Sequence, residues 1–91
     1  MNGRYAISTA GHDAGKIYII VGYENGRWLL SDGVEHKIAN CKKKNAKHVV
    51  IPNQEAPVEL ATIIEEKRRG CDEAIRQTLY HLNKDNLRYR A

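Results

Sequence analysis

The hydrophobic pattern of the chain changes near residues 51–59, IPNQEAPVE. Before this stretch, short runs rich in Ile, Val, Leu and Tyr are separated by turns, which is typical of strands. After it, apolar residues recur every three or four positions, which is typical of amphipathic helices. The pattern predicts a β part over residues 1–53 and a helical extension over residues 54–91, packed on or beside the β part.

The β part contains five runs that we predict to be strands. They are RYAIS (4–8), KIYIIVGYE (16–24), RWLLS (27–31), VEHKI (34–38) and KHVVI (47–51). The turns ENG and DG separate consecutive runs, and Asn-Gly and Asp-Gly favour the tight turns of β-hairpins. The run 16–24 is apolar on both faces, so we expect it at the centre of a closed or doubly covered sheet. Five such short strands predict a small, strongly bent barrel rather than a two-sheet sandwich, and closure would remove the exposed edges.

The helical part predicts two short helices. In the first, Pro57 suits the first turn and an apolar stripe follows at helical spacing, formed by Leu60, Ile63 and Ile64. The cations of residues 67–69 would lie in its last turn, where they favour the helix dipole, with Gly70 just past its end.

The second predicted helix, CDEAIRQTLYHL (71–82), opens with two acids and repeats apolar residues at Ile75, Leu79 and Leu82. One continuous helix through Gly70 is the alternative, since Cys71 lies on the same stripe as the first helix. We favour two separate helices. The tail NKDNLRYRA (83–91) is polar and is expected to fray.

Length and composition narrow the class of protein. The 91 residues suffice for one small core, and an apolar content of 42% is that of a globular chain. No stretch approaches the roughly 20 apolar residues that cross a bilayer, and the first residues lack the apolar core of a signal peptide. Cys41 and Cys71 are too few for a disulfide framework and are read as free thiols. We therefore expect a cytoplasmic protein, without a membrane partner.

Charge is unevenly distributed along the chain. The formal net charge is +4, and the segment HKIANCKKKNAKH (36–48) holds five lysines, two histidines and no acid. A local basic cluster favours nucleic acid as the partner. Surface lysines that only keep a small protein soluble are the alternative.

The stretch AGHDAGKIYIIVG (10–22) raises the question of what its glycine pair does. A dinucleotide fingerprint needs three glycines before a helix, and a P-loop needs Gly-Lys-Ser/Thr at the start of a helix. Here β-prone residues follow, so the context excludes both phosphate-binding loops. A glycine in such a turn instead permits positive φ and a close approach of backbone to RNA.

The stretch STAGHDAGKIYIIVG resembles the KOW motif of ribosomal proteins and transcription elongation factors. Gly15 matches the hallmark glycine of that motif, Lys16 its following basic residue, and Gly11 its first loop glycine. With LLSDG and KKKNAKH, the resemblance extends over about residues 3–52 to small bacterial KOW-domain RNA-binding proteins, relatives of an archaeal and eukaryotic large-subunit ribosomal protein. His12 departs from the family, which has a basic residue there, so the charge of the loop would depend on pH.

The resemblance implies an SH3-like five-stranded barrel, with short C-terminal helices, that binds structured RNA, most of all ribosomal RNA. The residues expected to contact RNA lie in the loop and in the basic segment. They are Gly11, His12, Gly15, Lys16, Lys37, Lys42, Lys43, Lys44, Lys47 and His48. At least two of the three consecutive lysines are expected to point to solvent. Four or five contacting charges would give log K against log salt a slope of about −3 to −4.5.

For the remaining basic and aromatic residues, we weigh contact with RNA against a structural role in the fold. Arg4 and Arg27 open predicted strands, where they either add to the basic surface or are ordinary rim charges, and we favour the second interpretation. His48 is either an RNA contact or a rim residue. Trp28 is expected in or over the barrel core, because the chain has no Phe to fill it. For Tyr23, base stacking and packing are weighted equally.

The histidines and cysteines show no paired metal-ligand spacing, and no nucleophile–base pair stands out, so we expect neither an enzyme nor a cofactor, metal or small-molecule substrate. The expected partner is RNA, on the ribosome or during its assembly, with the protein a monomer. The alternative is a protein-interaction module of SH3-like type. It would use the stripe of Leu60, Ile64, Ile75 and Leu79, for which packing on the barrel is the favoured interpretation.

Overall fold

The computed structural model of the chain describes residues 1–82, so the expectation of a fraying tail at 83–91 lies outside the described residues. Five strands are present: β1 (Tyr5–Ser8), β2 (Ile17–Glu24), β3 (Arg27–Ser31), β4 (Lys42–Asn45) and β5 (Val49–Val50). The helices are the one-turn 3₁₀ helices η1 (Ile38–Asn40) and η2 (Ala46–His48), and α1 (Val58–Glu65) and α2 (Cys71–Tyr80). The predicted class, mainly β with two helices at the C-terminal side, is confirmed.

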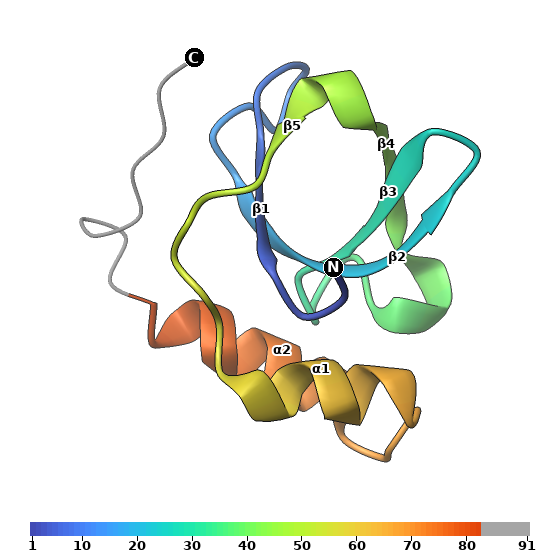
Figure 1. The fold of residues 1–91 in the computed structure, drawn as a ribbon, viewed down its shortest axis with the longest axis vertical. Helices are drawn as coiled ribbons and strands as arrows, with labels where there is room; N and C mark the ends of the chain where they lie inside the picture. The colour runs from blue at the N-terminus through green and yellow to red at the C-terminus, as the bar shows by residue number, and fades with distance from the viewer. Residues whose placement is uncertain (83–91) are drawn as a thin grey trace.

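All strands pair antiparallel in one sheet with the order β4-β3-β2-β1-β5. The sheet curves strongly, with η2 joining its two edge strands, β4 and β5 (Figure 1). Because the ladder ends at β4 and β5, the five strands form one open sheet. The central position predicted for the strand that is apolar on both faces is confirmed, since β2 is the middle strand.

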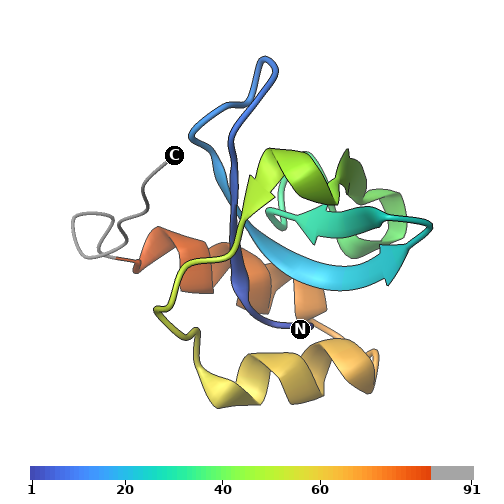
Figure 2. The same cartoon turned by 45° about the horizontal axis from the view of Figure 1, so that its top comes forward.

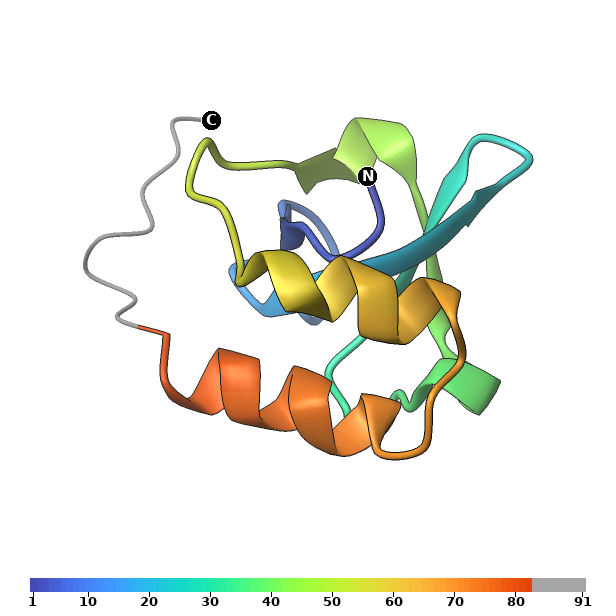
Figure 3. The ribbon, with the colours of Figure 1, turned by 60° about the horizontal axis from the view of Figure 1, so that its bottom comes forward.

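Each face of β2 supports its own hydrophobic cluster. The helix-side cluster lies between the sheet and the two α-helices, and consists of Tyr5, Ile7, Ile19, Leu60, Ile64 and Ile75. The inner cluster lies on the other face of the sheet, and consists of Ala6, Tyr18, Ile20 and Leu30. Each large side chain buried in this way stabilises the fold by about 1.5–3 kcal/mol. The helices therefore belong to the same core as the strands. Figure 3 shows the two helices lying side by side against the sheet.

The region predicted as a fourth strand, residues 34–38, is not a strand. Its backbone N–H groups are bound elsewhere: those of Val34 and His36 donate to the Asp32 carboxylate, both at 2.9 Å, and that of Ile38 donates to Asp72 at 2.8 Å. An aspartate that folds the chain back on itself in this way competes with a strand ladder for the same donors. The strand beside β3 is instead β4, the lysine-rich run 42–45.

The chain breaks between the helices, so two helices are present as predicted, but the turn differs from the prediction. Helix α1 ends at Glu65, and the chain reverses through Lys67, at φ 52°, and Gly70, at φ 82°, which precedes α2. The cations of residues 67–69 thus lie in the turn and not in the last helical turn, which is a correction. The thiol of Cys71 donates to the carbonyl oxygens of Arg68 and Ile63, at 2.7 and 3.2 Å, which closes this turn.

Both cysteines are free thiols. Among residues 1–82, no helix has the length and apolar character needed to cross a membrane.

Candidate nucleic-acid interface

The loop between β1 and β2, residues 9–16, rises from the sheet on the side opposite the helices (Figure 2). Its base is tied by backbone hydrogen bonds from Gly15 N–H to the Ser8 carbonyl, at 2.7 Å, and from Thr9 N–H to the His48 carbonyl, at 2.9 Å. Gly11 and Gly15 have φ of 87° and 90°, in the left-handed region that favours glycine. The glycines therefore shape the turn, which is the geometric role expected for them.

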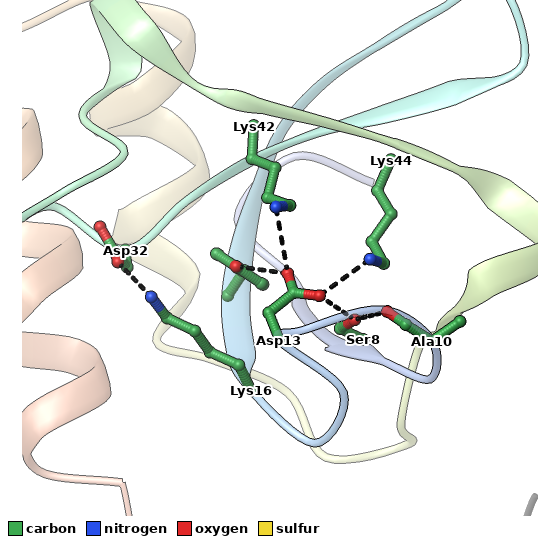
Figure 4. Close-up of polar contacts among 8 residues, drawn as sticks. Ser8, Ala10, Asp13, Lys16, Asp32, Lys42 and Lys44 are labelled. Carbon is green, nitrogen blue, oxygen red and sulfur yellow. Dashed lines mark hydrogen bonds and ion pairs between the residues drawn. The ribbon is translucent and has the colours of Figure 1, made fainter.

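The carboxylate of Asp13 is the centre of this loop (Figure 4). It accepts hydrogen bonds from the Tyr18 hydroxyl at 2.6 Å, the Ser8 hydroxyl at 2.8 Å and the Lys44 ammonium at 2.9 Å. The Lys42 ammonium lies 3.6 Å from its second oxygen. One loop residue thus joins β1 and β2, the strands on either side of the loop, to β4, which lies 31 residues away in sequence.

Burial opposes ionisation of Asp13, but the hydrogen bonds from Tyr18, Lys44 and Ser8 outweigh it and hold the pKa of this carboxyl well below its usual range. The pKa of Tyr18 is raised, first by burial and then by its bond to the ionised Asp13. At neutral pH, Asp13 is therefore a fixed negative charge beneath the lysines of β4.

A second carboxylate, Asp32, holds Lys16. The Lys16 ammonium lies 2.7 Å from Asp32 and 5.0 Å from the centre of the Tyr18 ring (Figure 4 shows the ion pair). Burial opposes ionisation of Asp32, but the bonds from Lys16 and from the N–H groups of Val34 and His36 lower its pKa to about 2. Lys16 is therefore a partner in an ion pair at the loop base, with 36% of its side chain exposed.

The three consecutive lysines do not share one environment. Alternation along β4 places Lys42 and Lys44 on the face of Leu30 and Trp28, their partners in β3, and places Lys43 on the other face. The Lys44 side chain is only 12% exposed and Lys42 is 33% exposed, against 47% for Lys43. The expectation that at least two of them point to solvent is wrong, because Asp13 compensates two of the charges on one face.

The other residues predicted to contact RNA do not all touch the Asp13 carboxylate. Lys37, just before η1, and Lys47, within η2, are exposed and make no ion pair within residues 1–82. His12 is exposed in the loop, whereas His48 is half-buried and its carbonyl accepts the bond from the loop. The structure brings together the loop, Lys42, Lys44 and the His48 backbone.

Arg4 and Trp28 both make contacts within the fold. The Arg4 guanidinium donates to the Pro52 carbonyl at 2.7 Å, while its Nε is buried without a partner among the described residues. Trp28 packs against the inner cluster, which confirms its expected place over the core. Arg27 is exposed at the turn between β2 and β3.

Most of the apolar stripe of the helices is buried. Leu60, Ile64 and Ile75 are 2%, 6% and 0% exposed, and Leu79 is half-buried against the same cluster. The favoured interpretation, packing on the sheet, is confirmed for these side chains.

Two features were missed in the sequence. Asp13 is the only acid of the loop and faces a lysine run that has no acid of its own, so charge complementarity is the signal that pairs them. The second feature is the Tyr23 and Trp28 pair, which flanks the Asn-Gly turn. A two-residue hairpin turn of this kind places the residues on either side opposite each other.

Among the described residues, no three His, Cys, Asp or Glu side chains are grouped in a way that would hold a metal ion. No model of a known protein family matches the chain, and no curated protein matches it either.

Proposed function

We propose that this chain is a cytoplasmic RNA-binding protein that contacts structured RNA, foremost ribosomal RNA, through its phosphates, on the ribosome or during its assembly. The observation that carries the proposal is the layout of the acid-free segment 36–48 along one edge of the sheet, through η1, β4 and η2. Three of its lysines, Lys37, Lys43 and Lys47, are exposed there. Exposed ammonium groups bind phosphate without regard to sequence, so RNA shape would supply any selectivity.

The fold type is part of the proposal. A short, strongly curved five-stranded sheet, with η2 between its edge strands, supports an SH3-like barrel of the KOW type (Figure 1). In that fold type, the loop 9–16 and its neighbouring lysines form the RNA-facing end. The loop rises away from the helices, which leaves this end accessible to a large partner (Figure 2).

The charge available for phosphate is smaller than the lysine count suggests. Lys42 and Lys44 share the negative charge of Asp13, whereas the pair between Lys43 and Glu24, at 3.5 Å with both side chains about half exposed, is weak. With about three effective contacts, log K against log salt is expected to have a slope of about −2 to −3. This replaces the steeper slope that a count of all the lysines predicts.

A purely structural role for the lysines is the competing explanation. Lysines on an edge strand prevent edge-to-edge pairing with other chains, and β4 is an edge strand. That role needs no RNA and predicts that loss of exposed lysines affects solubility alone.

The two explanations are separated by RNA binding of matched charge variants. The test variant is Lys43→Gln with Lys47→Gln, which leaves the Asp13 contacts intact. The control is Lys67→Gln with Arg69→Gln, which removes the same charge from the turn between the helices. We expect the test variant to bind structured RNA at least about tenfold more weakly than the control. Equal affinity of the two variants, or no binding by the unaltered protein, contradicts the proposal.

A further inference from the structure

The hairpin between β2 and β3 projects at one side of the molecule (Figures 1 and 3). Just before and after its turn it carries two aromatic residues, an exposed Tyr23 and a half-buried Trp28. Tyr23 and Trp28 are directly opposite in the register, with ring centres 4.7 Å apart and ring planes at 67°. Trp28 is anchored against the inner cluster, whereas Tyr23 is 57% exposed. Trp28 thus supports the Tyr23 ring on one side while more than half of the residue remains exposed to solvent.

The aromatic pair adjoins the lysine strand. Trp28 is paired across the sheet with Lys44, and directly paired residues point to the same face with their Cβ atoms about 5 Å apart. Tyr23, Trp28 and Lys44 therefore form one row across β2, β3 and β4. Arg27, at the turn beside this row, is also exposed.

The row and the cations near it provide the two kinds of contact that bind an unpaired RNA base. An aromatic ring held at a fixed angle offers a face for stacking that suits any base, and cations beside it suit the phosphates on either side of that base. The exposed cations near the aromatic pair are Arg27, at the turn, and Lys43, on the neighbouring strand β4, and Glu24 is the acid at the same turn. Lys44 lies in the row but is only 12% exposed and is paired with Asp13, so its charge is not available to a phosphate. An exposed ring beside exposed cations favours a nucleic acid over an apolar protein partner.

We propose that Tyr23 is a stacking platform for an unpaired base of the bound RNA, with Trp28 as its support. The proposal rests on the proposed RNA-binding function and adds a contact to the base itself. It predicts a preference for RNA that carries a loop, bulge or single-stranded end over a continuous duplex.

A cross-strand aromatic pair also stabilises a hairpin by itself, so the test must measure binding as well as folding. The chain has a single tryptophan, Trp28, whose emission reports directly on the neighbouring ring. The probe is a hairpin RNA with an unpaired loop, compared with the same RNA whose loop nucleotides lack bases, which keeps every phosphate.

We expect the unaltered protein to bind the base-containing RNA about tenfold more tightly than the abasic RNA, with a change in Trp28 emission only for the former. Tyr23→Leu should lose this preference, and Tyr23→Phe should keep it. Tyr80→Leu, which removes another exposed tyrosine, 77% exposed on α2, is the control and should bind like the unaltered protein.

Equal affinity of the unaltered protein for the two RNAs overturns the stacking proposal and leaves phosphate binding standing. This comparison needs no variant, so it remains decisive if Tyr23→Leu fails to fold. Binding by Tyr23→Leu with an unchanged preference for bases also overturns it. Failure of the unaltered protein to bind either RNA overturns the proposed function, and the stacking proposal with it.

Discussion

The ammonium group of Lys44 lies 2.9 Å from the carboxylate of Asp13, across 31 residues of sequence. This contact fastens the glycine loop to the edge strand, and it is buried enough that solvent screens it only partly, with side-chain exposures of 12% and 14%. The loop and the lysine strand, which sequence patterns treat as separate elements, therefore form one unit.

Removal of Asp13 should destabilise the protein. Asp13→Ala leaves the Lys44 charge and the Tyr18 hydroxyl without their partner in a poorly solvated site, so we expect a loss of about 2–4 kcal/mol in the free energy of unfolding. The measurement is urea denaturation. Glu24→Ala, which removes the half-exposed partner of Lys43, is the control and should cost less than about 0.5 kcal/mol. Similar losses for the two variants would contradict the structural role of Asp13.

Stability should fall in acid because two carboxyls have lowered pKa values. The pKa of Asp32 drops from 3.8 to about 2 on folding, and that of Asp13 also drops. The unfolded chain therefore takes up protons first. The stability contributed by each group is complete above the unfolded pKa and is lost as pH falls through the folded pKa.

For Asp32 this contribution is about 2 kcal/mol, so the free energy of unfolding should decrease steeply between about pH 4 and pH 2. Asp32→Asn should be less stable at pH 7 and should show a shallower decrease. Thermal unfolding over this pH range measures both effects. A variant with the same acid profile as the unaltered protein would show that Asp32 does not carry the dependence.

Gly33 should be intolerant of a side chain, because a Cβ there would collide with the backbone of helix α2 at Asp72. Gly26 provides the matched control. Its φ of 78° is close to the 76° of Gly33, but a Cβ at Gly26 meets nothing within 4 Å. Gly26→Ala should cost about 1 kcal/mol from backbone strain alone, and Gly33→Ala about 3 kcal/mol. Equal costs would mean that α2 does not dock against this turn.

The helices and the sheet should unfold together. Ile75 on α2 is fully buried against the sheet, so Ile75→Ala should cost about 2–5 kcal/mol, whereas Val58→Ala, at a side chain 79% exposed, should cost less than about 0.5 kcal/mol. Helical circular dichroism and Trp28 emission should then report one transition. Separate transitions would show that the helices form an independent unit.

Alternation and turn chemistry were sufficient to predict most of the strands. Strand β3 begins and ends where RWLLS does, and the apolar faces of β2 predicted its central position. The error at residues 34–38 has a physical cause, since Val34, His36 and Ile38 alternate correctly but their N–H groups bind Asp32 and Asp72. A hydrophobic pattern does not reveal which acidic side chains accept hydrogen bonds from backbone N–H groups.

The candidate site was predictable only in part. Charge density identified the segment 36–48, but a count of lysines does not reveal which of them meet an acid from elsewhere. Asp13 and Glu24 lie far from β4 in sequence and reach it only through the fold. The helix end was misplaced for a local reason: Lys67 adopts positive φ as well as Gly70, and the sequence predicts positive φ only for the glycine.

The central claim is that exposed lysines of the segment 36–48 bind RNA phosphates, and the salt dependence of binding tests it most directly. For structured RNA, log K against log salt should have a slope of about −2 to −3, and Lys43→Gln with Lys47→Gln should reduce its magnitude by about 1.5. Lys67→Gln with Arg69→Gln should leave the slope unchanged. A slope that both double variants change equally, or binding that does not depend on salt, would contradict the account.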